Sequence, residues 1–278
     1  MFLPVTFLYS QQSGNSAYGQ NYSYGKQAAT GNLYLSDSTF LIEANVMSNT
    51  KADEYVVTFG LDEEASTLKE CNEKMEKRIQ SFAADLVRMG IPVRDIYVDM
   101  TTQNKIYDYK VTGQMAEQYV KGFELKKNVI TKFKNIKDLD EMIIAASNHQ
   151  IYDLVKVDYI VTNLNEVYTQ LFKSAMEVIN QKKDLYSMAT GSKLLPMSQI
   201  YGEQFYSYYP SQLYKNYTAY SSSEVYTDAS TVKEARKSPV FYYDKIDYSG
   251  FDKIIEPSVT EPAVEFVLTL QVRYEMEK

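Results

Sequence analysis

The segment from Thr67 to Pro92 constrains the fold most strongly, because its sequence marks both ends of a helix. The run Thr67-Leu-Lys-Glu70 has the form of a capping box, in which hydroxyl and carboxylate oxygens satisfy free backbone donors at a helix start. Gly90 supplies a left-handed residue past the helix end, and Pro92 prevents the helix from resuming. Apolar residues between these ends recur three or four positions apart: Leu68, Met75, Ile79, Phe82, Leu86 and Met89. The sequence therefore predicts a helix with one apolar face.

Short runs rich in β-branched and aromatic residues flank this helix. Residues 40–46 and 54–59 are predicted to form two adjacent strands joined by a polar connection. Apolar and polar residues alternate over 96–101, which predicts a half-buried strand after the helix. A further strand is predicted at 264–272, close to the end of the chain.

The middle of the chain also alternates between strands and helices. Residues 122–133, 138–148 and 154–161 are predicted to form a strand, a helix and a strand, which together make a βαβ unit. Asn165 can cap a long helix that ends at Gly191. We therefore expect an α+β protein of two small α/β units, with mixed or antiparallel sheets packed by long helices and an inner βαβ unit of ferredoxin-like type.

The start of the chain has the pattern of an export signal. Its first nine residues are largely apolar, Ser10 is small and Gln11 begins a polar stretch, which is typical of the end of a secretory signal. The basic region that normally opens such a signal is missing, so we interpret 1–10 as a truncated or misassigned signal peptide. Residues 11–38 are rich in Ser, Gly, Asn, Gln and Tyr, a composition that buries too little surface to order itself.

The composition is unusual in its aromatic residues, with 26 Tyr and no Trp in 278 residues. Periodicity is lost over 195–262, where Tyr is crowded between Gly, Pro and Ser residues. Tyrosine combines an apolar ring with a polar hydroxyl, and it is therefore enriched on partly solvated surfaces such as interfaces. We expect 195–262 to be a Tyr-rich surface insertion that contacts a partner.

Composition and spacing argue against several classes of function. A net charge of −7, without a compensating Lys/Arg-rich stripe, argues against nucleic-acid binding. No segment reaches the ~20 apolar residues that a transmembrane helix needs. No Cys/His spacing suits a metal, and isolated glycines make neither a phosphate loop nor a dinucleotide fingerprint. We expect no cofactor, metal, nucleic-acid partner or transmembrane span.

Three groups of residues could carry chemistry, and each has a simpler explanation. His149, the only histidine, follows a predicted helix, where an imidazole binds terminal carbonyls or faces water, and no Gly-x-Ser-x-Gly elbow accompanies it. Cys71 neighbours Glu70 and Glu73, whose charges raise the pKa of a thiol. The acids Asp62-Glu-Glu64 precede a helix, whose dipole favours them. We therefore expect no catalytic, cofactor-binding or metal-binding residue.

Four segments carry a resemblance to a known family: Ala52-Asp-Glu-Tyr-Val-Val-Thr-Phe-Gly60, Leu86-Val-Arg-Met-Gly-Ile-Pro-Val-Arg-Asp-Ile-Tyr97, Lys121-Gly-Phe123 and the helix from Ala175 to Leu194. In this order, and with the final strand, they resemble the SIMPL-domain family of bacterial envelope proteins over about residues 40–200. The second segment is similar to the family's leucine-x-x-x-glycine-isoleucine and aspartate-isoleucine passage. The chain departs from the pattern in its alanine-poor second long helix and in its Tyr-rich addition.

This resemblance implies an exported, periplasmic or cell-envelope protein that forms a homo-oligomer, as at least one family member forms a ring or channel-like assembly. It also implies a link to oxidative-stress tolerance, for which the family has no established enzymatic activity. The expected parts of the chain are, in order, the signal remnant at 1–10, a flexible segment at 11–38, an outer SIMPL-like α+β unit at 39–112, 163–194 and 263–278, an inner βαβ unit at 113–162 and the insertion at 195–262.

Three functions remain open at this point. The leading hypothesis is a non-enzymatic, self-assembling envelope protein. The alternative is a binding module that presents the Tyr-rich insertion to a glycan, a peptide or a protein partner. The third is a hydrolase or redox enzyme, which would have to use His149 or Cys71.

Overall fold

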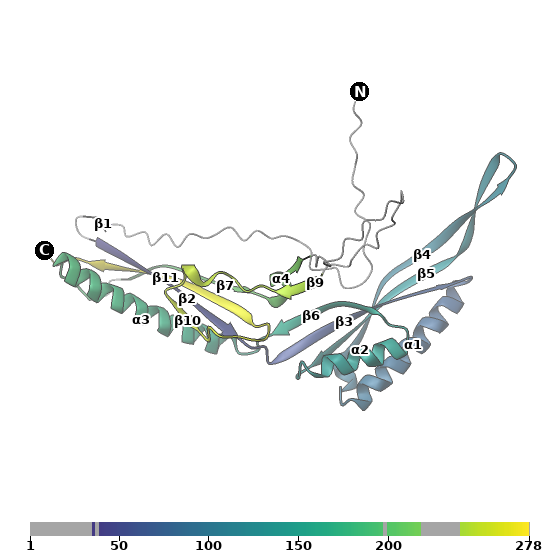
Figure 1. Ribbon diagram of the computed structural model, residues 1–278, viewed down its shortest axis with the longest axis horizontal. Coiled ribbons are helices and arrows are strands. Elements are labelled where there is room, and N and C mark those ends of the chain that lie inside the picture. Colours follow the sequence, from purple (N-terminus) through teal and green to yellow (C-terminus); the bar gives the residue numbers. More distant parts are fainter. Residues whose placement is uncertain (1–34, 37–38, 197–198, 218–239, 278) are drawn as a thin grey trace, which may run out of the picture. The chain divides into compact units, whose positions relative to one another are not determined.

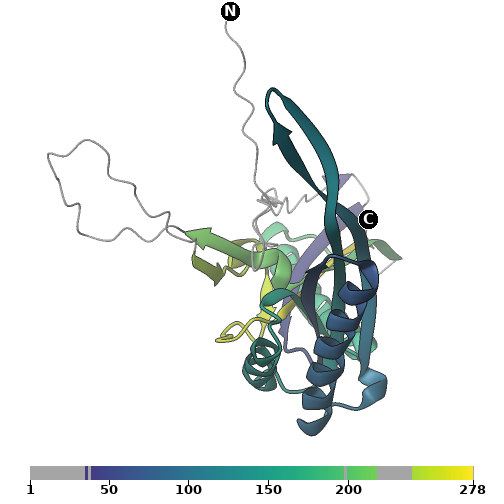
Figure 2. The ribbon, with the colours of Figure 1, turned by 90° about the vertical axis from the view of Figure 1, so that its right-hand side faces the viewer.

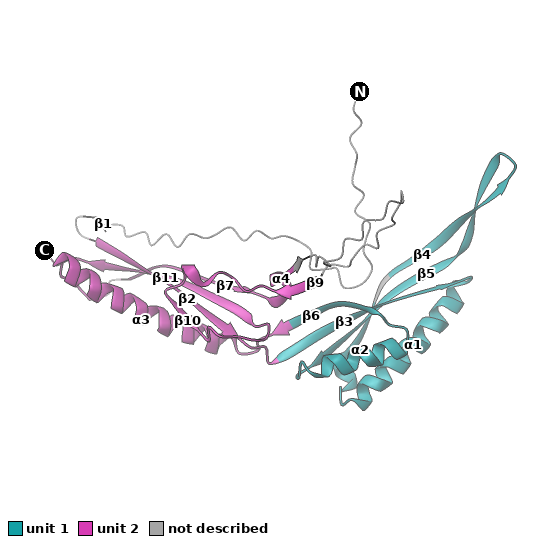
Figure 3. Ribbon diagram, viewed as in Figure 1, with its two compact units in different colours: residues 1–17, 54–158 teal, residues 18–53, 159–278 magenta. Residues whose placement is uncertain are grey.

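The computed structural model describes residues 35–36, 39–196, 199–217 and 240–277 (Figure 1). Helices occur together with strands in several sheets, so the expected α+β class is confirmed. The chain divides into two compact units: unit 1 contains Glu54–Asp158, and unit 2 contains the described residues before Glu54 and after Asp158 (Figure 3). The expected signal remnant, nearly all of the segment at 11–38 and the centre of the Tyr-rich insertion lie outside the described residues.

Unit 1 has the ferredoxin-like order of elements, βαββαβ. Its four-stranded sheet has the order β4-β5-β3-β6, and β5 is antiparallel to both β4 and β3. Helix α1 packs against β3 and β5. The elements in chain order are β3 (Glu54–Ala65), α1 (Leu68–Arg88), a 3-10 turn (Val93–Asp95), β4 (Ile96–Thr112), β5 (Met115–Phe133), α2 (Asp138–Asn148) and β6 (Asp153–Ile160).

Helix α1 confirms the helix that the sequence predicted between Thr67 and Gly90. The Thr67 hydroxyl accepts a hydrogen bond from the backbone N–H of Glu70 at 3.2 Å, as expected. The Glu70 carboxylate, which was expected to accept from a backbone donor, accepts from a side chain, Ser66 Oγ, at 3.0 Å. The buried side chains follow the helical period: Cys71, Met75, Ile79, Phe82 and Leu86. Past the helix end, Gly90 has a φ of 96°, as a left-handed residue at this place should.

The division into units differs from the expected one. Strand β3, assigned to the outer unit at 39–112, lies between β5 and β6 of the expected inner unit at 113–162. The expected boundary after residue 112 falls in the tight turn between β4 and β5, at Gly113. Strands 40–46 and 54–59, expected side by side, belong to different sheets. These partners are distant in sequence, and local periodicity does not encode them.

Unit 2 contains a five-stranded sheet of order β1-β2-β11-β7, with β10 also pairing with β2. Helix α3 covers one face of this sheet, where apolar residues of β2 and β11 pack against its buried side. Its elements are β1 (Leu35–Ser36), β2 (Thr39–Thr50), α3 (Leu164–Thr190), β7 (Gln199–Tyr208), α4 (Pro210–Leu213), β8 (Tyr214–Tyr217), β9 (Val240–Tyr243), a 3-10 turn (Tyr248–Gly250), β10 (Lys253–Ile255) and β11 (Val264–Glu275).

Two expectations for unit 2 need correction. Helix α3 ends at Gly191 as expected, but Asn163 and not Asn165 caps its start, by accepting a hydrogen bond from Glu166 N at 3.3 Å. The Tyr-rich segment at 195–262 is not wholly a surface addition, because β7 lies within it and pairs with β11 from Tyr208 to Gln199. Strand β7 is an edge strand with many exposed side chains, and it therefore lacks the apolar alternation of a buried strand.

Strands β4 and β5 are longer than the sequence predicted. Strand β4 continues to Thr112 and β5 begins at Met115, so that the polar stretch from Lys110 to Gln118 is paired backbone and not a loop. The paired strands continue past the end of β3 (Figure 2).

Candidate functional site

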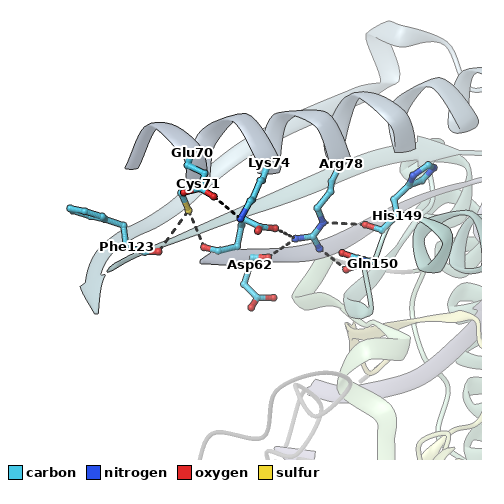
Figure 4. Close-up of polar contacts among 9 residues, drawn as sticks. Asp62, Glu70, Cys71, Lys74, Arg78, Phe123, His149 and Gln150 are labelled. Carbon is cyan, nitrogen blue, oxygen red and sulfur yellow. Dashed lines mark hydrogen bonds and ion pairs between the residues drawn. The ribbon is translucent and has the colours of Figure 1, made fainter. Parts of the chain in front are cut away.

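The residues that could carry chemistry in unit 1 lie around the side of α1 that faces β3 and α2 (Figure 4). Arg78 of α1 is central to them. Its Nε donates to the carbonyl oxygen of His149 at 3.1 Å, and its Nη1 donates to the carbonyl oxygen of Asp62 at 2.6 Å and to Glu63 Oε2 at 2.8 Å. The guanidinium thus ties α1 to the end of β3 and to the turn after α2.

The acidic run Asp62-Glu-Glu64 lies within β3 and not at a helix entrance. Its position in the strand alternates the side chains, so that Glu63 is half-buried against Arg78 while Asp62 and Glu64 belong to the other face. The residues described include no group of three or more His, Cys, Asp and Glu side chains placed to hold a metal ion. The contacts of the run therefore join strand to helix.

Cys71 is buried in the first turns of α1, where it contacts both neighbouring strands. Its Sγ donates to the carbonyl oxygen of Glu63 at 3.1 Å and lies 3.9 Å from that of Phe123. Burial raises the pKa of this thiol, and the negative charge of Glu63 raises it further. A thiol held protonated in this way is a poor nucleophile.

His149 lies at the C-terminal end of α2, as the sequence predicted. Its Nε2 lies 2.8 Å from Oδ2 of Asp85 on α1, and its carbonyl oxygen is the acceptor for Arg78. This residue therefore links the two helices of unit 1 through both its ring and its backbone. The sequence did not identify Arg78 or Asp85 as its partners, because neither lies near His149 in the chain.

Unit 2 contains a buried acidic residue, Glu265 of β11, that the sequence analysis did not select. Its Oε1 accepts a hydrogen bond from the Tyr243 hydroxyl at 2.9 Å, and its Oε2 accepts one from Ile246 N at 3.3 Å. Burial raises the pKa of Glu265, and burial with the nearby carboxylate raises the pKa of Tyr243. The pair fastens the end of the Tyr-rich segment to the sheet. Its only early sign was an acid inside an otherwise apolar strand.

Asn49 of β2 lies directly opposite Glu265 and extends this fastening. Its Nδ2 donates to the Tyr248 hydroxyl and to the carbonyl oxygen of Glu256, both at 2.8 Å. Two tyrosines of the expected insertion thus bond to the sheet of unit 2. Their hydroxyls are used inside the protein.

The end of the β4–β5 hairpin, residues 106–122, makes few contacts with the rest of unit 1, and we call it the hairpin arm. Gly122 is buried at its base, but nearly every other side chain is exposed, including Val111 at 70% and Met115 at 78%. Among the described residues, the arm has two paired strands and neither a third strand nor a helix over it. A two-stranded hairpin alone is at best marginally stable in water.

The two faces of the hairpin arm differ in charge. Directly paired residues share a face, and successive pairs alternate between faces. The uncharged face consists of Tyr107, Tyr109, Val111, Ala116, Gln118 and Val120. The charged face consists of Asp108, Lys110, Thr112, Met115, Glu117 and Tyr119. Lys121 is the extra residue of a β-bulge between Val120 and Gly122, and its ammonium lies 3.7 Å from the Asp108 carboxylate on this face. Such an amphipathic pattern on exposed strands is typical of a protein–protein contact surface.

Comparison with protein-family models identifies a family for this chain. The family model described as SIMPL, protein of unknown function (DUF541), matches residues 43–241. This span continues past α3 through β7, α4 and β8 of the Tyr-rich segment. A search of curated proteins found no match to the chain. None of the helices in the described ranges is long and apolar enough to cross a bilayer.

Proposed function

The chain belongs to the SIMPL family, and on this premise we propose that it is an exported, non-enzymatic envelope protein that assembles with copies of itself through the hairpin arm. The observation that carries the proposal is the uncharged face of the arm, which exposes tyrosine and valine side chains on an unsupported pair of strands. A second copy would cover these side chains and support the strands.

Charge favours this surface over others for contact between copies. The chain has a net charge of −7, so two copies repel one another at most approaches. A face without charged residues allows close approach without that penalty, and aromatic side chains supply contact area there. Specific, stable contacts between proteins bury about 800 Å² per partner, so the arm would dock along its length and not at its tip alone.

The contacts of Cys71 and His149 support the non-enzymatic part of the proposal. The thiol is buried and protonated against a backbone carbonyl, and the imidazole is paired with Asp85 between two helices. These contacts give both residues a structural role, in which they connect elements of unit 1. The binding-module alternative has less support, because Tyr243 and Tyr248 bond to the sheet of unit 2.

The test changes the uncharged face and measures assembly. The double substitution Tyr109→Ser with Val111→Ser should shift the full-length protein toward the monomer in sedimentation velocity, because it removes apolar contact area from both copies. The matched control is Tyr152→Ser with Ile144→Ser, which removes the same kinds of exposed side chain elsewhere in unit 1. Unchanged assembly of the arm variant, or equal loss in the control, would remove the arm from the proposal.

Export and the stress role are tested in the native host. N-terminal sequencing of the protein recovered from the envelope fraction should give a chain that begins near Gln11. Deletion of the gene should lower survival in peroxide, and the arm variant should fail to restore it. An uncleaved chain confined to the cytoplasm would overturn the export proposal.

A further inference from the structure

The edge of β5 that faces away from β4 offers a place for another strand. Strand β3 pairs with β5 from Phe123 to Phe133 only. Residues 115–122 therefore have β4 on one side, and no strand of the described chain pairs with their other side. The N–H and C=O groups of such an edge can pair with a further strand, which supplies main-chain hydrogen bonds.

The charges along this edge fit the same edge of a second copy. Glu117 and Lys121 lie two residues before and two residues after Tyr119. Glu117 and Tyr119 share the charged face. Lys121 is the extra residue of a β-bulge, and its ammonium lies 3.7 Å from the Asp108 carboxylate, which places that charge on the same face. An antiparallel partner with a two-fold axis at Tyr119 would bring Glu117 of each copy to Lys121 of the other, and the long lysine side chain can reach the carboxylate from its place in the bulge. Opposite charges in directly facing positions stabilise a strand pair.

Neighbouring registers do not give this match. An axis at Gln118 would place Glu117 opposite Tyr119 and Lys121 opposite Met115. An axis at Val120 would place Lys121 opposite Tyr119 and Glu117 opposite Phe123, whose backbone already pairs with β3. Registers whose axis falls between two residues would place the charged face of one arm on the same side of the sheet as the uncharged face of the other. The axis at Tyr119 is therefore the register that the charges select.

We propose that the β5 edges of two copies pair antiparallel around Tyr119, so that two hairpin arms form one continuous sheet. This inference rests on the proposed self-assembly and adds an edge contact to the contact through the uncharged face. In the shared sheet, the uncharged faces of the two arms lie on the same side. The occupant is a second copy of this chain, because Glu117 and Lys121 complement themselves about the axis. An unprotected edge with only lysines would repel a second copy, and here each lysine meets a glutamate.

Cross-linking tests the register directly. Facing Cα atoms in antiparallel strands are about 4.5–5.5 Å apart, which lies within the range that a disulfide spans. Full-length protein carrying Tyr119→Cys should therefore form a covalent dimer on mild oxidation with copper phenanthroline. Tyr107→Cys is the matched control, since Tyr107 is 50% exposed and Tyr119 48%, but Tyr107 lies on β4 and on the other face. The unaltered chain, whose Cys71 is buried, should not cross-link.

Charge reversal tests the pairing without cysteine. Glu117→Lys alone, or Lys121→Glu alone, converts two attractive pairs per dimer into two repulsive ones and should weaken self-association by about tenfold or more. Mixing the two variants should restore association, because each then offers the charge that the other lacks. The doubly exchanged chain should also associate like the unaltered one. Lys110→Glu, on the arm but not on this edge, should change association less than either reversal does.

The outcomes separate the inference from the function on which it rests. Self-association of the unaltered chain, without a Tyr119→Cys cross-link and without restoration on mixing, would overturn the register while self-assembly stands. A strictly monomeric unaltered chain would overturn both. A cross-link at Tyr119→Cys that is absent at Tyr107→Cys, together with restoration on mixing, is the result that the proposal requires.

Discussion

Gly122 shows how a single residue fixes the base of the hairpin arm. A Cβ at this position would lie 2.6 Å from the backbone carbonyl oxygen of Ala65, the last residue of β3. A Cβ at Gly202 of β7 would also be crowded, but by Oε1 of Gln271 at 2.8 Å, which is the far end of a flexible side chain. A Cβ would be similarly crowded at the two glycines. At Gly122 backbone would have to move, whereas at Gly202 the Gln271 side chain could move instead.

Alanine substitutions should separate these two cases. Gly122→Ala should lower the free energy of unfolding by about 1–3 kcal/mol, because backbone has to move. Gly202→Ala should cost less than about 1 kcal/mol, because Gln271 can turn aside. Thermal melting followed by circular dichroism measures both. Equal costs at the two sites would contradict the close approach of β3 to Gly122.

Glu265 makes the stability of unit 2 depend on pH. Burial raises its pKa above the value in the unfolded chain, so the protonated carboxyl favours the folded state. Its contribution is complete below the unfolded pKa and is lost as the pH rises through the folded pKa. Glu265→Gln should remove this fall in stability between mildly acidic and neutral pH. Glu275→Gln, an exposed change on the same strand, should leave it, and chemical denaturation across that range tests both.

Strand β7 gives the Tyr-rich segment a structural role at the scale of elements. It pairs with β11 along its length, and Tyr243 and Tyr248 connect the end of the segment to Glu265 and Asn49. Replacement of 198–260 by a short Gly/Ser linker would uncover one edge of β11 and leave Glu265 without its donors. We expect this change to unfold unit 2 or to lower its melting temperature strongly.

A smaller replacement provides the control. Tyr217 and Val240 are facing partners in the β8–β9 hairpin, so a short turn can join them in place of 218–239. That variant should keep the melting behaviour of the unaltered chain. If the larger replacement left a folded, cooperative unit 2, β7 and the Glu265 contacts would be dispensable.

Elements with local signals were predictable from the sequence, and elements defined by distant partners were not. Thr67 marks a helix start through its side-chain cap, and Gly90 and Gly191 mark helix ends through left-handed backbone conformations that few other residues adopt. The structure has helix ends at all three. The extension of β4 to Thr112 and the strand β7 had no such signal. Both are exposed strands, held by cross-strand hydrogen bonds that any sequence can make.

The candidate site was hidden from the sequence for the same reason. The two faces of the hairpin arm become visible only when the register pairs Tyr109 with Gln118 and Lys110 with Glu117. Before that, the stretch from Lys110 to Gln118 has the composition of a polar loop. Cys71 and His149 were found readily because they are rare, but their partners Glu63 and Asp85 depend on packing.

At the scale of the whole molecule, family membership and the surface of unit 1 lead to the same proposal. The SIMPL family match covers most of the described chain but carries no stated function. The proposal therefore depends on the hairpin arm, which is exposed and amphipathic and consists, among the described residues, of two paired strands. Self-assembly gives this arm a use that unit 1 alone does not.

The most direct test of this account is the mass of the full-length particle in solution. Multi-angle light scattering over a wide range of concentrations should give a multiple of the 32.0 kDa chain mass, and the multiple should fall when Tyr109→Ser and Val111→Ser are introduced together. A mass of one chain at every concentration would contradict the central claim.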